Sequence, residues 1–273
     1  MTPRAQVFAI HAGLVALALL TLFPLLWMIS ASLMPAGEAT ALPLRFWPSR
    51  VTWEHYVALF SRLDVLRYAF NSALLATVVT IVSLVLNSMA GYAFAKLRFA
   101  RRETLFRGLL AAMVIPAQVS MLPLFLLLKQ LGLINTYAGV IIPGMASIYG
   151  IFLIRQYAQS IPDSLLDAAR IDGAGEFRIY WSIMLPLCQP ILVTLAIFTF
   201  MGTWNDFMWP LIVLTDSSMH TLPVALANLV GEHVQDTELV MAGAVVTVLP
   251  VLLLFLALQR YYIEGLVLGG LKE

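Results

Sequence analysis

Long apolar segments alternate with shorter polar ones along the whole chain. Six windows contain no Asp, Glu, Lys or Arg, and each is long enough to cross a bilayer, which takes about 20 residues. The windows are Ala5–Gly37, Tyr68–Ala95, Gly108–Leu128, Gln130–Ile154, Ile179–Asn205 and Leu239–Gln259. Because lipid offers the backbone no hydrogen-bond partners, each window is expected to be helical. The pattern predicts an all-α, polytopic membrane protein with a single domain and six transmembrane helices, at about 7–33, 68–95, 107–128, 138–154, 187–212 and 239–259.

Charge is scarce throughout the chain. Hydrophobic residues make up 61% and charged residues 11% of the 273 positions, and the mean hydropathy is +0.89. Soluble domains carry roughly 25% charged residues, so the composition excludes a soluble globular protein. The first apolar window could be mistaken for a signal peptide, but it is much longer than the typical apolar core of about 7–15 residues. We therefore expect it to be a retained span.

Lysine and arginine are distributed unevenly between the two sides of the six-span arrangement. One side carries 11 of the 16 basic residues: Arg4, those of the 96–107 linker and the 155–186 loop, Arg260 and Lys272. An excess of basic residues in short loops marks the cytoplasmic side of a membrane protein. Both termini and the 155–186 loop are therefore expected to be cytoplasmic.

The residues offer no pattern for catalysis or metal binding. The single Cys188 has no partner for an internal disulfide, and the histidines lack metal-ligand spacing; they are His11, His55, His220 and His233. A phosphate-binding P-loop is missing as well, because Leu271 follows Gly270 where a lysine is needed. We therefore expect no enzymatic activity and no nucleotide site on this chain. A secondary carrier is also disfavoured, since the six windows hold no carboxylate.

The 155–186 loop is polar, yet its first half has the pattern of a short helix. Pro162 suits the first turn, where no amide hydrogen bond is lost, and Asp163 and Asp167 place negative charge near the positive helix end. Gly173 permits the left-handed turn that ends a helix. A helix is therefore predicted from about Asp163 to Gly173.

The second half of the loop predicts another helix, from Glu176 to Met184, which Pro186 interrupts before the next span. The loop is thus expected to be a hairpin of two short helices outside the membrane. From the residues alone, this hairpin could rest on the inner leaflet. It could also bind another protein, because Ala168 and Ala169 leave one face open to close approach.

The spacing of residues in this loop is similar to that of a known motif. Asp167-Ala168-Ala169, three residues, Gly173, nine residues, Ile183, one residue and Leu185-Pro186 resembles the EAA loop of ABC importer permeases. The one departure is Asp167 in place of glutamate, which keeps the carboxylate. Other segments resemble carbohydrate-importer permeases, most closely the smaller subunit of maltose-type pairs; they are Phe70–Ser72, Ala90–Ala95, Gly132–Tyr137, Trp204–Phe207 with Pro210–Leu211, and Gln259–Leu266.

The resemblance implies a permease subunit in the cytoplasmic (inner) membrane of a bacterium or archaeon. Its partners would be a second permease, two cytoplasmic P-loop ATPases, which hold ATP and Mg, and an extracytoplasmic sugar-binding protein; this chain itself would bind no cofactor. The 163–186 segment would couple the permease to an ATPase. Ala168, Ala169 and Gly173 would supply the fit, Asp167 a polar contact, and Ile183 with Leu185-Pro186 the junction to the span. A permease for another solute, such as a polyol or glycerol phosphate, remains the alternative.

A few polar residues on the spans are candidates for the path of the sugar. Amide side chains hydrogen-bond sugar hydroxyls and an indole ring stacks on the sugar face; the candidates are Asn71, Asn87, Trp204, Asn205 and Asp206, with Ser72, Ser88, Gln118 and Ser120 as further polar span residues. Asp206 is expected toward the outer end of its span. The alternative is that the Asn and Ser side chains hold helices together in lipid.

An amphipathic helix is also expected in the outer segment after the first span. Trp53, Tyr56, Val57 and Phe60 follow the i, i+3, i+4, i+7 spacing of one helix face, and Thr52 could cap it. This helix could rest on lipid headgroups or form a platform for an extracytoplasmic partner.

Overall fold

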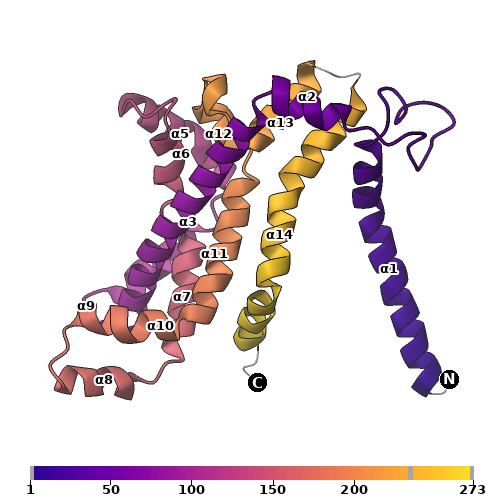
Figure 1. Ribbon diagram of the computed structural model, residues 1–273. Coiled ribbons are helices and arrows are strands. Elements are labelled where there is room, and N and C mark those ends of the chain that lie inside the picture. The colour runs from indigo at the N-terminus through magenta and orange to yellow at the C-terminus, as the bar shows by residue number, and fades with distance from the viewer. Residues whose placement is uncertain (1–2, 233–235, 271–273) are drawn as a thin grey trace. The chain divides into compact units, whose positions relative to one another are not determined.

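The computed structural model describes residues 3–232 and 236–270 (Figure 1). Three residues of the sequence argument, His233, Leu271 and Lys272, lie outside the described residues. Within the described part the chain forms helices and no strand, which confirms the predicted all-α class. Four helical segments are long and apolar enough to cross a membrane, or up to six if two bent helix pairs each form one span; the four are Gln6–Ala31, Val65–Lys96, Tyr137–Gln159 and Thr237–Gln259.

The helices follow one another with short connections. Their bounds are α1 (Pro3–Ala31), α2 (Glu54–Arg62), α3 (Val65–Lys96), α4 (Arg102–Ala112), α5 (Ala117–Gln130), α6 (Tyr137–Gly144), α7 (Ile148–Gln159), α8 (Asp163–Ile171), α9 (Glu176–Ile179), the π-helix η1 (Tyr180–Met184), α10 (Leu185–Leu187), α11 (Gln189–Trp204), α12 (Met208–Val213), the 3-10 helix η2 (Ser217–Met219), α13 (Leu222–Glu232) and α14 (Thr237–Gly270).

Three of the expected spans are not single straight helices. The span at 138–154 is divided between α6, which ends at Gly144, and α7, which begins at Ile148. In place of a span at 107–128, α4 and α5 meet at an angle of 100°. The break is at Pro116, which has extended backbone angles at the start of α5 and lacks an N–H to continue the preceding helix. In place of a span at 187–212, α11 ends at Trp204 and α12 begins at Met208.

The chain divides into two compact units, 1–67 with 225–250 and 68–224 with 251–273. In the first unit, buried polar contacts fix the segment that follows α1. Glu238, at the start of α14, is fully buried and accepts a hydrogen bond of 2.7 Å from the Ala39 N–H. The buried His55 ring bonds the Met34 carbonyl at 2.9 Å. These contacts hold a segment that lacks regular structure of its own.

Helix α2 of the first unit presents an apolar face to its surroundings. The residues that face the interior are His55 and Leu59, whereas Trp53, Val57 and Phe60 are all exposed. The helix begins at Glu54, and the Thr52 hydroxyl accepts a hydrogen bond of 3.3 Å from the Glu54 N–H. Three of the four residues of the expected apolar face are therefore directed away from the core, whereas Tyr56 is half-buried and its hydroxyl lies 2.8 Å from Ser32 Oγ.

In the second unit, α3 packs closely on α7 through small residues. A Cβ added to Gly91 of α3 would lie 2.5 Å from the Ile154 side chain, and one added to Gly150 of α7 would lie 2.5 Å from the Asn87 amide. Apolar clusters fill both ends of this unit. One includes Leu75, Leu128, Val140 and Val213, at the end formed by α5, α6 and α12; the other surrounds α8, η1 and the adjoining parts of α3, α7 and α11 (Figure 1).

The close approach at Gly91 predicts that this position does not accept a methyl group. Gly91→Ala should lower the thermal midpoint of the purified chain in detergent, because overpacking costs about 1–3 kcal/mol. Gly108→Ala on α4 is the matched control, since its new Cβ would meet nothing within 4 Å and alanine favours a helix. The measurement is the temperature at which a thiol-reactive dye labels Cys188, which is 3% exposed. Equal midpoints for the two variants would contradict the packing.

Candidate functional site

The 155–186 loop folds as two helical elements below the ends of α3 and α7 (Figure 1). Helix α7 ends at Gln159, and α8 follows after a turn of three residues that ends in Pro162. The second element is continuous from Glu176 to Leu187 and comprises α9, η1 and α10. The predicted pair of short helices is therefore present.

The turn after α8 depends on Gly173. Its φ is +82°, the left-handed conformation that residues with a Cβ rarely adopt. The Ala174 N–H donates to the Ala169 carbonyl at 2.9 Å, and the Gly173 N–H donates to the Arg170 carbonyl at 3.0 Å. This pair of bonds is the Schellman pattern, which satisfies carbonyls that a helix end would otherwise leave unpaired. Gly173 thereby sets the direction in which the chain leaves α8.

Helix α8 has one face turned to the protein and one turned outward. Leu166 is buried and Ala169 half-buried, and both pack in the apolar cluster of the second unit. Asp167 and Ala168 are exposed, and Ile171 is 87% exposed. The two alanines of the motif are thus not equivalent, since Ala169 belongs to the loop's own packing and Ala168 lies on its free surface.

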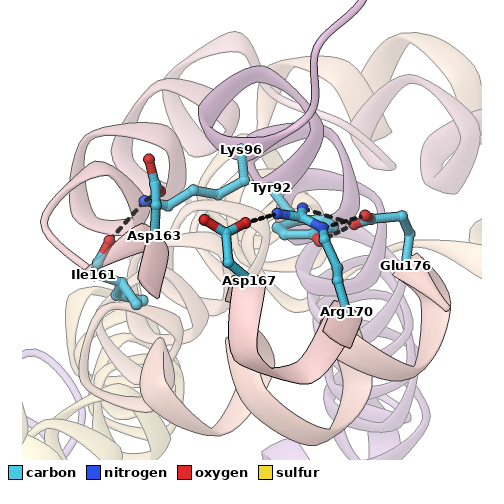
Figure 2. Close-up of polar contacts among 7 residues, drawn as sticks. All are labelled: Tyr92, Lys96, Ile161, Asp163, Asp167, Arg170 and Glu176. Atoms are coloured by element: carbon cyan, nitrogen blue, oxygen red, sulfur yellow. Dashed lines mark hydrogen bonds and ion pairs between the residues drawn. The ribbon is translucent and has the colours of Figure 1, made fainter. Parts of the chain in front are cut away.

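Arg170 joins the two helical elements (Figure 2). Its guanidinium lies between Asp167 of the same helix and Glu176 at the start of α9, with a distance of 2.8 Å to each carboxylate. The Tyr92 hydroxyl of α3 donates to the same Glu176 carboxylate. The carboxylate expected to serve as a polar contact, that of Asp167, is therefore already paired within the loop. Charge-assisted bonds of this kind are stronger than neutral ones.

Lys96, the last residue of α3, holds the start of α8. Its ammonium donates to the Ile161 carbonyl and to the Asp163 carboxylate, both at 2.6 Å, and its side chain is 5% exposed (Figure 2). The hydrogen bond from Lys96 holds the pKa of the Asp163 carboxyl below its usual value. Asp163 is therefore ionised at neutral pH, where it pairs with the lysine.

The second element contains a wide turn ahead of the proline. The Leu185 N–H donates to the Tyr180 carbonyl, five residues earlier. Pro186 lacks an N–H, and its ring crowds the carbonyl four positions earlier, so a π turn fits just before it. The helix continues through Pro186 and breaks at Cys188, where it meets α11 at 78°. The interruption predicted at Pro186 was therefore placed two residues early.

The remaining motif residues divide between interior and surface. Ile183 and Leu185 are partly buried and pack against the apolar cluster of the second unit. Pro186 is exposed and lines an open, apolar cavity of about 330 Å³ together with Leu84 of α3 and Leu192 of α11. These residues join the loop to the spans on either side.

Two of the residues expected on a sugar path are committed to contacts within the chain. Asn71 is buried; its amide donates to the carbonyls of Ser218 and His220 at 3.0 and 2.9 Å and accepts from the Tyr137 hydroxyl at 2.8 Å. Asn87 is fully buried, donates to Ser83 Oγ at 2.7 Å and accepts from the Ser147 N–H at 3.0 Å. Both side chains hold helices and connections together.

The other three expected path residues lie at the break between α11 and α12. Trp204 is buried and its ring stacks on Phe200 at a centroid distance of 6.0 Å. Asn205 is exposed and donates to the Met201 carbonyl at 2.9 Å. Asp206 is half-buried, and its carboxylate accepts from the Trp209 N–H at 3.3 Å. Among the five, Asn205 and Asp206 present polar atoms nearest to open surface.

The sequence argument missed the residues that attach the loop to α3. Tyr92, Lys96, Arg170 and Glu176 were not expected in the site, although Tyr92 lies within a segment used for the resemblance. Spacing gives no signal for a contact between residues 84 positions apart, such as that between Tyr92 and Glu176. One local signal was available: Ser88, Tyr92 and Lys96 follow one another at i, i+4 and i+8 on the span. Among the described residues, no group of three His, Cys, Asp or Glu side chains could hold a metal.

Comparison with known proteins gives consistent similarities along the chain. A family model described as binding-protein-dependent transport system inner membrane component matches residues 87–266. The chain is 40% identical to the arabinooligosaccharides transport system permease protein AraQ of Halalkalibacterium halodurans, over 95% of this chain and 94% of that one. It is 32% identical to the lactose transport system permease protein LacG of Rhizobium radiobacter, over 93% and 92%. It is 30% identical to the sn-glycerol-3-phosphate transport system permease protein UgpE of Yersinia enterocolitica, over 94% of both chains.

A solved structure has the same fold. It is a chain from a bacterial ABC transporter involved in the import of the acidic polysaccharide alginate, with a TM-score of 0.85 and 24% sequence identity, over 96% of this chain and 99% of that one. The helical arrangement of this chain is therefore shared with a known membrane transport protein.

The turn geometry predicts that Gly173 and Gly175 respond differently to the same substitution. Gly173→Ala places a Cβ at positive φ, which costs roughly 1–2 kcal/mol, so amide hydrogens around 169–176 should exchange about tenfold faster. Gly175→Ala is the control, since Gly175 has a φ of −72° and an added Cβ would meet nothing within 4 Å. Hydrogen–deuterium exchange measured by mass spectrometry on the chain in nanodiscs compares them. An equal effect of both variants would argue against the Schellman turn.

Proposed function

Because this chain belongs to the family of inner membrane components of binding-protein-dependent transport systems, we propose that it is a permease subunit of an ATP-driven importer of sugars, most directly of oligosaccharides. The observation that carries the substrate class is the 40% identity, along almost the whole of both chains, to a permease named for arabinooligosaccharides. The family resemblance expected from the 167–186 spacing is confirmed by the family match, which includes that segment.

The proposal assigns the chain one half of a translocation path. A second permease would complete the path, an extracytoplasmic binding protein would deliver the sugar, and two cytoplasmic ATPases would hold ATP and Mg. The chain would have no catalytic activity of its own, in keeping with the missing P-loop pattern. Both termini and the 155–186 loop would face the cytoplasm, as the distribution of lysine and arginine favours.

The outward face of the 155–186 loop supports its role as the docking element. Leu165, Ile171 and Phe177 are large apolar residues that are exposed in this chain, and a partner protein would remove their surface from water. Ala168 and Gly173 leave space beside them, and nothing lies within 4 Å of a Cβ added to Gly173. A groove on an ATPase could therefore approach the backbone of α8 closely. ATP can reorient the spans only if the loop binds differently in the two states of the ATPase.

Glycerol phosphate or a polyol is the second candidate substrate. The observation in its favour is the 30% identity to a permease named for sn-glycerol-3-phosphate, over 94% of both chains. The two candidate functions share the architecture and the coupling loop and differ only in the solute.

Uptake by the reconstituted importer tests the substrate class. Vesicles that contain this chain, the second permease, the ATPase and the binding protein are supplied with ATP and a panel of labelled oligosaccharides, monosaccharides and glycerol 3-phosphate. We expect ATP-dependent uptake and stimulated ATP hydrolysis with an oligosaccharide. Uptake of glycerol 3-phosphate alone would move the assignment to the second candidate, and ATP-independent uptake would overturn both.

The exposed position of Ala168 predicts a docking defect without a folding defect. Ala168→Trp should leave the chain inserted and folded but reduce both co-purification with the ATPase and sugar uptake by roughly tenfold, the order expected when a close interface is overpacked by about 1–3 kcal/mol. Ala100→Trp, at another exposed alanine on the same proposed side, is the matched control and should behave as the unmodified chain. Full uptake by the Ala168→Trp variant would rule out docking through this face.

A further inference from the structure

We propose that α3 is the span that the 155–186 loop moves directly, and that Ser88, Tyr92 and Lys96 transmit the movement. This inference rests on the proposed function, because it assumes that an ATPase moves the loop. It goes beyond the proposed function by naming the span to which the loop passes its movement. The three residues are positioning residues and make no contact with ATP or sugar in this scheme.

The three side chains form one stripe along the helix. Their spacing of i, i+4 and i+8 places them on the same face of α3, over two turns. Each reaches a different part of the loop. Ser88 Oγ lies 2.7 Å from the Tyr180 hydroxyl in η1, Tyr92 donates to Glu176 at the start of α9, and Lys96 bonds Ile161 and Asp163 at the start of α8. Both helical elements of the loop are therefore attached to one rigid span.

The contact between Ser88 and Tyr180 is buried, which makes it difficult to exchange for water, whereas the Lys96–Asp163 pair lies at the surface because Asp163 is exposed. Ser88, Tyr92 and Tyr180 are all buried, and the rings of the two tyrosines lie 5.8 Å apart. A buried polar group that loses its partner suffers the full desolvation penalty. When the loop is displaced, α3 therefore follows more readily than these bonds break.

The covalent connections of the loop transmit movement less directly. The loop joins α11 through the 78° bend at Cys188 and α7 through the turn at Ser160–Pro162. By contrast, α3 is one unbroken helix of 32 residues. It also packs on α7 at Gly91 and Gly150, so a displaced α3 takes α7 with it.

The other end of α3 is attached to the opposite side of the same unit. Asn71 donates to the Ser218 and His220 carbonyls, and Ser72 Oγ accepts from the Leu222 N–H at 2.8 Å. The same helix thus binds the 155–186 loop at one end and the 218–222 segment at the other. Movement of α3 would therefore displace the 218–222 segment when the ATPases close on the inner side.

Coupling between hydrolysis and uptake tests the inference. In vesicles with the complete importer, the number of ATP molecules hydrolysed per sugar taken up is measured for Tyr92→Phe, Lys96→Met and the double variant. We expect the ATPase to remain bound and active while the ratio rises about fivefold in Tyr92→Phe, a factor in line with the loss of one hydrogen bond, and further in the double variant, which loses the Lys96 bonds as well. Lys96→Arg keeps a cationic donor and should restore most of the coupling.

The matched controls remove a tyrosine hydroxyl and a lysine ammonium at positions that do not contact the loop. Tyr68→Phe changes a tyrosine at the other end of α3, and Lys129→Met changes an exposed lysine on α5; both should leave the ratio unchanged. The labelling temperature of Cys188 checks that each variant is folded. An unchanged ratio in the double variant would overturn the inference, and so would a loss of bound ATPase that lowers hydrolysis and uptake together. Absence of ATP-dependent uptake in the unmodified complex would instead refute the proposed function.

Discussion

The attachment of the 155–186 loop to the end of α3 underlies the proposed function of this chain. Helix α8 has 9 residues, and isolated helices shorter than about 12–15 residues are marginal in water. Buried contacts supply the missing stability: Leu166 packs in the apolar cluster, and Lys96 bonds the start of the helix. In the proposed function, the loop could transmit a force from an ATPase because these contacts attach it firmly to the spans.

This attachment divides the motif into two sets of residues with different tasks. Ala169, Ile183 and Leu185 pack inward and shape the hairpin, whereas Ala168 and Gly173 lie on the surface. Asp167 pairs with Arg170 in the same helix, so its carboxylate stabilises the hairpin before it meets any partner. Most residues of the motif therefore shape the hairpin, and the proposed docking face is smaller than the motif.

Two polar residues on the spans are likewise paired within the chain. Within a membrane an amide or hydroxyl needs a partner, and Asn71 and Asn87 find theirs in connections and helix starts of the same chain. Their amides link α3 to the neighbouring connections and helix starts of the second unit. At the break between α11 and α12, Asn205 is exposed and Asp206 half-buried, so polar groups stay near the surface there.

Local properties of the sequence were enough to predict the all-α membrane class and the two-helix loop. These properties are the length of the apolar segments, the distribution of charge, and the presence of Pro162, Gly173 and Pro186 where the loop helices begin or end. The spacing from Asp167 to Pro186 also identified the family. Three features came from the packing of helices against one another: the break at Cys188, the opposite environments of Ala168 and Ala169, and the place of Tyr92 and Lys96 in the site. A contact such as that between Tyr92 and Glu176 joins residues 84 positions apart, and no periodicity along the chain encodes it.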